Sequence, residues 1–425
     1  MTLNRNIQPP IFDIEKIENP IIEKISLKNK TKLHIVKGGS QDILKIDFVY
    51  NAGTFQQEKP VVASMTSAML NEGSKKYSAF EIAESFDYRG AYINTSISNH
   101  KGIVSVICLT KDLDDLLEIV QDMILRPQFP KKEFDTIREN RKNSFITESE
   151  KTSTIARKHF LKNLFGINHS YANIVDSDDF DKLKIEDLVD FHSKNYSSES
   201  CNIVICGKVE DEHIDSIKKY FDIEYGCNNL REERKLSIDT NEKRKFFIKK
   251  EEAAQSSIRI GCISINKNHK DFVGLTVVNT ILGGYFGSRL MSNIREDKGY
   301  TYGINSGLAS LPKTGFFCIV TDVNNDIRDL AIQEIYKEIK ILQEEKISEA
   351  ELQLVKNYMI SELLRSLDGP FSVSDLVNQN LFFEIEEDYL QDSLDIIKNI
   401  QAEDIMNLSN KYLKIDNLIE VVVGA

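Results

Sequence analysis

Histidine and cysteine are common metal ligands in proteins, and their spacing in this sequence gives no support to a local metal site. The seven histidines form no HxxxH or HxxEH pattern, which would place two imidazoles on one face of a helix. The six cysteines form no CxxC pair, and several lie within apolar runs such as CNIVICG and FFCIV. We therefore interpret the cysteines as buried thiols rather than as zinc ligands or disulfides.

A glycine-rich segment, LGGYFGSRLMSNIREDKGYTYGINSG at 282–307, is the second place where chemistry could occur. Glycines before a helix can bind phosphate, but GGYFGSRL lacks the P-loop lysine and the GxGxxG spacing, which disfavours nucleotide binding. The pattern predicts a turn and then a helix that is capped by Ser288 and ends at Gly299. Three residues form its apolar face: Leu290, Met291 and Ile294.

Length and charge restrict the class of protein. A chain of 425 residues is long enough for two or more domains. The net charge of -12 argues against a nucleic-acid partner or an anionic membrane surface, because phosphate binding relies on clustered lysine and arginine. No apolar run reaches about 18 residues, and MTLNRNIQPPIFDIEKI lacks the apolar core of a signal peptide. We expect no membrane span and a cytoplasmic location.

The elements that must position any site occur twice in the same order, which indicates an internal duplication. KIEDLVDFHSKNYSSESCNIVICG, ending at Gly207, matches QAEDIMNLSNKYLKIDNLIEVVVG, ending at Gly424. Each half also has an alternating strand, a helix ending in glycine, and a long amphipathic helix, at 112–124 and 326–342. These signals predict an α+β fold of two homologous domains, each a mainly antiparallel sheet with helices packed on it.

A polar, charge-rich stretch separates the two halves and predicts the linker between them. The expected boundaries are an N-terminal domain at 1–224, a linker at 225–247 and a C-terminal domain at 248–425.

The segment VVASMTSAMLNEGS after Pro60 reads as a helix that stops at Gly73, and here the sequence resembles the pitrilysin/insulinase (inverzincin) metallopeptidases, in their processing-peptidase-like bacterial branch. That family carries a segment like GxAHFLEHMLFKGT. Its two histidines share a helical face and bind zinc, and the glutamate between them activates the zinc-bound water. The resemblance covers essentially the whole chain.

The resemblance places Ser64 and Ala68 at the histidine positions and Ser67 at the glutamate position. The family's third ligand, a glutamate on a later helix, would fall at about Asn143 to Phe145, where no carboxylate is present. This chain thus lacks the zinc residues, and we expect no metal on it. We interpret Ser64 and Ser67 as small packing residues rather than substitute nucleophiles, because the helix offers no neighbouring base.

The glycine-rich segment resembles the family's RExxGxxY motif, here Arg295, Glu296, Gly299 and Tyr302. In relatives the arginine and tyrosine point across a central cavity towards the zinc-bearing domain. Their donors can hold a peptide carbonyl and stabilise the oxyanion that develops during hydrolysis. The structural alternative is that Arg295 pairs with Glu296 or Asp297 and that Tyr302 belongs to a strand core.

Other positions that match the family carry weaker expectations. Gln255 and Arg289 are candidate substrate-binding residues, although for Arg289 a buried structural ion pair is the favoured interpretation and cavity lining the alternative. Gln255 lies at the start of a strand where exposed edge backbone could pair with an extended peptide. His169 and Tyr171, in FGINHSYAN, are expected to be structural.

The resemblance implies a non-catalytic, substrate-binding subunit of a heterodimeric zinc metalloendopeptidase. The partner chain would bear HxxEH and the zinc, and the substrate would be an extended, unfolded peptide. An alternative is a peptidase-like scaffold that binds peptides or organises an assembly without proteolysis, as the core proteins of the respiratory cytochrome reductase do. A third hypothesis, a self-sufficient peptidase with an unusual metal site, requires ligands that the sequence does not supply.

Overall fold

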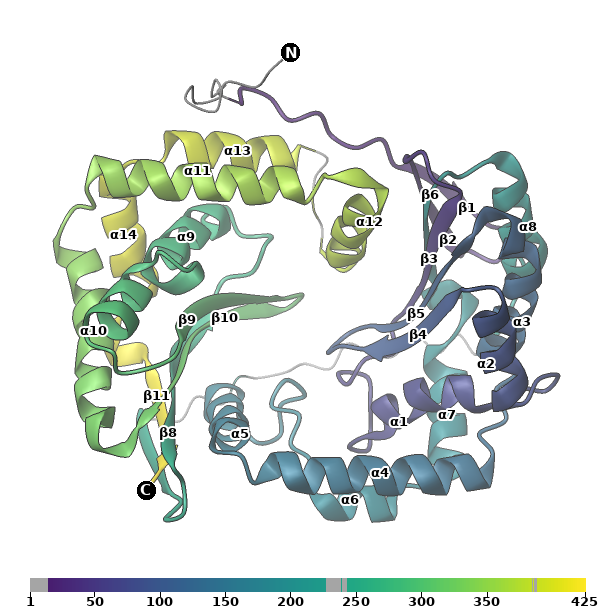
Figure 1. Ribbon diagram of the computed structural model, residues 1–425, viewed down its shortest axis with the longest axis horizontal. Coiled ribbons are helices and arrows are strands. Elements are labelled where there is room, and N and C mark those ends of the chain that lie inside the picture. The colour runs from purple at the N-terminus through teal and green to yellow at the C-terminus, as the bar shows by residue number, and fades with distance from the viewer. Residues whose placement is uncertain (1–13, 227–237, 239–242, 384, 386–387) are drawn as a thin grey trace, which may run out of the picture.

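The computed structural model describes residues 14–226, 238, 243–383, 385 and 388–425. The chain forms two similar halves, each built on one sheet, that face one another across the middle of the molecule (Figure 1). Among the described helices, none combines the length and the apolar character that a membrane span needs.

The first sheet has six strands in the order β1-β2-β6-β3-β5-β4. All neighbours pair antiparallel except β2 and β6, which run parallel. The alternation in ILKIDFVY explains the middle of this sheet, because Leu44, Ile46 and Phe48 enter one core while Asp47 faces the other side. The strands are β1 Glu23–Ser26, β2 Lys32–Lys37, β3 Ile43–Tyr50, β4 Tyr92–Ile97, β5 Gly102–Leu109 and β6 Asn202–Gly207.

The second sheet repeats this topology with five strands in the order β7-β11-β8-β10-β9. Its one parallel pair, β7 with β11, corresponds to β2 with β6, and every other pair is antiparallel. The expected duplication and the α+β fold of two homologous domains are confirmed. The strands are β7 Lys245–Lys249, β8 Gln255–Ser264, β9 Ile304–Leu311, β10 Thr314–Asn324 and β11 Ile419–Gly424.

Amphipathic helices cover the outer face of each sheet and form its main core. The helices of the first half are α1 Val62–Met69, α2 Ala79–Tyr88, α3 Leu113–Leu125, α4 Lys131–Ser149, α5 Thr152–Phe165, α6 Ser177–Lys182, α7 Ile185–Asn195 and α8 Asp211–Phe221. Those of the second half are α9 Phe272–Asn279, α10 Arg328–Glu344, α11 Glu349–Arg365, α12 Gly369–Asn380, α13 Tyr389–Asn399 and α14 Ala402–Tyr412.

The inner faces are covered by an exchange of helices between the halves. Helix α5 of the first half packs on β8 and β11 of the second sheet, and α12 of the second half packs on β2 and β6 of the first. A buried hydrogen bond of 2.6 Å from Asn378 Nδ2 to Asp47 Oδ2 fixes α12 in place. The halves therefore form one structure, since each completes the other's packing.

The expected linker, 225–247, lies mostly outside the described residues. At its edges, the hydroxyls of Tyr225 and Tyr50 are 2.8 Å apart in the first core, and β7 already begins at Lys245.

Candidate functional site: a degenerate zinc helix beside an interdomain cavity

Helix α1 begins at a strained residue. Val61, directly before the helix, has φ of 60°, in the left-handed region that a β-branched side chain rarely adopts. The family segment GxAHFLEH has glycine at this position. A non-glycine residue there costs about 1–3 kcal/mol, which the packing around the helix must offset. Val61 therefore holds, at the start of α1, a backbone conformation that glycine would adopt without strain.

The side chains at the zinc positions of α1 offer no metal ligand. Ser67 is buried, Ala68 is half-buried, and the Ser64 hydroxyl donates a hydrogen bond of 2.9 Å to the carbonyl of Val61 one turn earlier. Within the described ranges, no group of three or more His, Cys, Asp or Glu side chains is arranged to hold a metal ion. Hydroxyl and methyl groups cannot replace imidazoles as zinc ligands, so these residues do not fit the metal.

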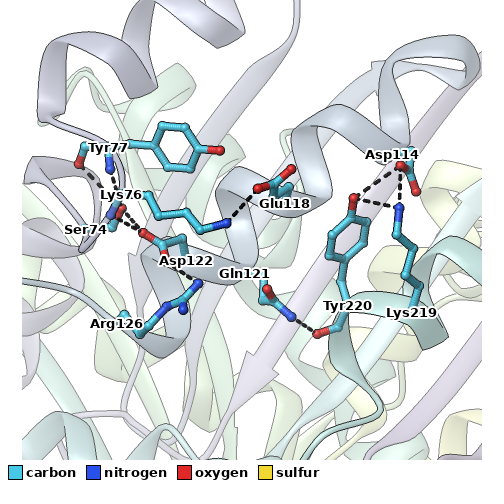
Figure 2. A network of polar contacts seen from close by, with 10 residues as sticks. All are labelled: Ser74, Lys76, Tyr77, Asp114, Glu118, Gln121, Asp122, Arg126, Lys219 and Tyr220. Carbon is cyan, nitrogen blue, oxygen red and sulfur yellow. Dashed lines mark hydrogen bonds and ion pairs between the residues drawn. The ribbon is translucent and has the colours of Figure 1, made fainter.

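A network of polar contacts fixes the turn that follows α1 (Figure 2). The fully buried Asp122 carboxylate on α3 accepts hydrogen bonds from the Ser74 hydroxyl at 2.5 Å and from the Lys76 amide at 2.7 Å. It also pairs with Arg126 at 2.5 Å. Gly73, at φ of 132°, lets the chain turn into this network. The position of α1 is therefore determined by buried contacts rather than by a metal.

A cavity of about 710 Å³ lies between the two halves, beside α1. Val61 and Ser64 form part of its wall, and Asn305 and Leu308 of β9 form part of the wall from the second half. Six aromatic residues line it: Phe145, Phe160, Phe165, Tyr171, Phe180 and Phe316. The size and the aromatic lining suit a short stretch of peptide with bulky side chains.

Phe145 in this wall belongs to the window, Asn143 to Phe145, where the family resemblance would place the third ligand. It belongs to α4, which packs against α1, and it lines the same cavity as Ser64. The structure thus brings together the two segments that the resemblance assigns to zinc, α1 and the window Asn143 to Phe145. Neither segment carries a carboxylate at the positions that the resemblance singles out.

The β4–β5 hairpin of the first half reaches towards the β9–β10 hairpin of the second (Figure 1), and Asn99 and Leu311 at their tips line the cavity. The Nε2 atom of His100, in the first hairpin, is 2.8 Å from the hydroxyl of Tyr171. Burial, aided by the charges of Lys313 and Lys101, lowers the pKa of His100 to about 4. Burial also raises the pKa of Tyr171 to about 12, so this pair is neutral near pH 7.

His169 and Tyr171 are both buried, and the Tyr171 amide donates to His169 Nδ1 at 3.1 Å. These contacts agree with the structural role expected for the two residues.

Arg295 lies on a π-helical segment, Met291–Asp297, and stacks over the ring of Phe286 at 4.7 Å. Asn293 holds this segment on α10, because its side-chain amide donates to Glu338 at 2.6 Å. Within the described part of the chain, Arg295 makes no ion pair with Glu296 or Asp297. The structural alternative for this arginine is therefore wrong.

Tyr302 follows in a short loop whose backbone is fixed and whose ring is free. The Thr301 hydroxyl lies 2.8 Å from the Asp322 carbonyl oxygen and accepts a hydrogen bond of 3.1 Å from the Gly303 amide. The Tyr302 side chain is nevertheless 95% exposed. It is not part of a strand core, so that alternative is also wrong, and neither Arg295 nor Tyr302 belongs to the described cavity wall.

The remaining expected residues occupy different surroundings. Arg289 makes a bidentate ion pair with Glu351, at 2.8 and 2.9 Å, and lies outside the cavity wall. Gln255 begins β8, which pairs with β10 and β11 and so is an interior strand rather than an exposed edge. The expectation of free edge backbone at Gln255 is wrong, because the edge strand on that side is β9.

Ser288 and five of the cysteines complete the comparison with the sequence. Ser288 is buried, but its side chain makes no capping hydrogen bond with the described residues, since Leu290 leads directly into the π-helical segment. The five described cysteines are buried free thiols, as expected. Cys227 lies outside the described residues.

Arg259 is a cavity residue that the sequence did not single out. It lies in β8, between Val320 and Val421 on the neighbouring strands, and contributes to the cavity wall. Its signal in the sequence is a single arginine within the apolar alternation of SSIRIGCISI, which also fits an ordinary solvent-facing position.

Comparison with known proteins places both halves in one group. A family model described as insulinase (peptidase family M16) matches residues 49–177, and one described as the peptidase M16 inactive domain matches residues 182–359. A relative from Bacillus subtilis named uncharacterized zinc protease YmxG is 23% identical, over 83% of this chain and 86% of its own length. The non-peptidase homolog YmxG of Helicobacter pylori is 21% identical, over 85% of this chain and 84% of its own.

A solved structure described as the peptidase M16 inactive domain from Pseudomonas fluorescens has the same fold, with a TM-score of 0.87. It is 22% identical and covers 95% of this chain and 98% of its own.

Proposed function

Because the chain belongs to the peptidase M16 (insulinase) family as an inactive, peptidase-like member, we propose that it is the non-catalytic, substrate-binding subunit of a heterodimeric zinc metalloendopeptidase. A partner subunit bearing HxxEH supplies the zinc, and the substrate is an extended, unfolded peptide. Arg295 and Tyr302 complete the active site of the complex, where they hold the substrate carbonyl and stabilise the oxyanion.

One observation carries this proposal: Tyr302 is held on a fixed loop with its ring almost fully in solvent, seven positions after Arg295, which stacks on Phe286. Phe286 is itself 64% exposed. Aromatic and arginine side chains presented on a rigid support are typical of residues that contact a partner or substrate. Among the described residues, the half-buried Arg295 has no ion-pair partner, and the Tyr302 ring is almost fully exposed.

The cavity supports the substrate-handling part of the proposal. Gln255 and Arg289 lie outside its wall, so their contribution to binding would be to support the second half rather than to contact peptide. Edge strand β9 contributes alternate residues to the wall and could pair its backbone with an extended peptide.

The test is to mix the chain with an HxxEH-bearing family member from the same genome and to measure zinc content, complex formation and cleavage of an unfolded peptide. Arg295→Ala should lower kcat by about 100-fold while the complex still forms, because it removes a donor to the developing charge. Arg328→Ala is a matched control, since Arg328 stacks on Phe247 at 4.8 Å in the same half. A complex with no peptidase activity would favour the scaffold alternative. Full activity of Arg295→Ala would exclude the proposed role of that residue.

A further inference from the structure

The cavity wall carries an unusual charge for this protein. Among its described residues are Arg157, Lys158 and Arg259, but no aspartate or glutamate. The chain as a whole is acidic, with a net charge of -12. The described cavity wall therefore differs in charge from the chain as a whole.

Arg259 has no acidic partner among the residues that the structure describes. Its position in the middle of β8 places it on the inner face of the second sheet, among Val320, Val421 and Phe316. Its Nε atom is buried and has no hydrogen-bond partner among the described residues, and the side chain forms no ion pair there. The residue as a whole is half-buried, and partial loss of water around a guanidinium is unfavourable unless an acceptor or an anion replaces that water.

The two other cationic side chains of the wall, Lys158 and Arg157, differ in their hydrogen-bond and ion-pair partners. Lys158 on α5 is bound by Asp176 at 2.7 Å and by the carbonyl of Val175 at 2.9 Å. Arg157, its neighbour on α5, makes no ion pair within the described part of the chain. The first half thus adds one uncompensated cation to a cavity in which the second half provides Arg259.

We infer that the cavity selects peptides that carry a carboxylate beside a bulky apolar side chain, with Arg259 as the residue that binds the carboxylate and Arg157 as a second cation at the wall. This inference rests on the proposed function, because it specifies which peptides the subunit takes. The planar guanidinium can bind both carboxylate oxygens, and the aromatic wall accommodates the apolar neighbour. A basic peptide would instead bring a second positive charge to Arg259.

The test uses the full chain and labelled peptides of one length that contain Glu-Phe, Gln-Phe or Lys-Phe in an otherwise neutral sequence, with both ends blocked. Fluorescence anisotropy should show the Glu-Phe peptide binding about 10- to 100-fold more tightly than the Gln-Phe peptide, and the Lys-Phe peptide binding most weakly. A fourth peptide contains Gln-Phe and has an unblocked C-terminus. Its binding shows whether the cavity recognises a terminal carboxylate rather than a side-chain carboxylate.

Arg259→Gln should abolish the preference for Glu over Gln, and Arg157→Gln on the exposed surface of α5 should reduce it. Arg328→Gln, outside the cavity, should leave it unchanged. The Arg157 variant keeps the test decisive if Arg259→Gln does not fold. Equal binding of the blocked Glu and Gln peptides, with no gain from a free C-terminus, would overturn the inference and leave the proposed function intact. If no peptide binds the chain, and none is cleaved by its mixture with the HxxEH partner, the proposed function fails as well.

Discussion

At the scale of single residues, the two groups of positions that the family resemblance singles out differ in this chain. The positions assigned to zinc hold Ser64, Ser67 and Ala68, whereas the Tyr302 ring is 95% exposed and Arg295 stacks on Phe286. The family resemblance predicted both groups from the sequence. It could not predict whether Arg295 and Tyr302 were engaged by the chain itself, because that depends on tertiary contacts.

Tyr302→Phe tests the phenol hydroxyl alone. We expect kcat of the complex to fall by about 10- to 100-fold with no change in Tm, since the ring is 95% exposed and supports no packing. Tyr88→Phe, on a ring that is 87% exposed in the first half, is the control. Steady-state kinetics and thermal unfolding give both readouts. A loss of Tm without loss of kcat would show that Tyr302 is structural.

His192 makes the stability of the first half depend on pH. Burial lowers the pKa of His192 to about 4, and its Nε2–H group donates a hydrogen bond of 2.8 Å to the Ile124 carbonyl oxygen. The unfolded chain takes up this proton near pH 6.5, before the folded chain does, so stability falls as pH drops from about 6.5 to 4. Over this pH range, the His192 imidazole lowers the free energy of unfolding by about 3 kcal/mol.

His192→Gln should flatten that part of the pH profile, even if it lowers stability at pH 7. Urea unfolding at several pH values measures the difference in slope between the two proteins. Parallel profiles for the wild type and the variant would contradict the assignment to His192.

At the scale of elements, α1 is positioned by its neighbours. Asp122→Ala should cost about 3 kcal/mol of unfolding free energy, because the Lys76 amide and the Ser74 hydroxyl lose a buried acceptor. Asp114 is also on α3, and Asp114→Ala removes its exposed ion pair with Lys219 of α8, which should cost less than about 1 kcal/mol. Urea unfolding distinguishes the two. Equal costs would mean that the buried network does not fix α1.

The sequence predicted most regular elements but not their irregular parts. Periodicity placed α3, α10 and β3 within a few residues, because each has one apolar face. It did not predict the π-helical turns around the glycine pair, which depend on a tertiary contact. A Cβ on Gly283 would lie 2.7 Å from the Ser306 amide nitrogen, so only glycine lets this segment approach β9. The packing of α5 and α12 on the sheet of the opposite half likewise could not be predicted, because it leaves no pattern in the local sequence.

At the scale of the whole molecule, the exchanged helices determine how the two halves enclose the cavity. Asn378→Ala should loosen α12 from the first sheet, because Asp47 loses its donor from the second half. Amide hydrogen exchange in α12 should become about tenfold faster. Asn399→Ala on α13, where the amide bonds only to its own helix, is the control. Unchanged exchange in α12 would place the rigidity elsewhere.

The cavity, the half-buried Arg295 and the exposed Tyr302 lie in one molecule that offers no zinc ligands at the positions that the family resemblance assigns to them. The most direct test is the turnover of one unfolded peptide by this chain alone, by its HxxEH partner alone, and by an equimolar mixture. The account predicts no turnover by this chain and a large gain in the mixture over the partner alone. Hydrolysis by this chain alone, or a mixture no faster than the partner, would contradict it.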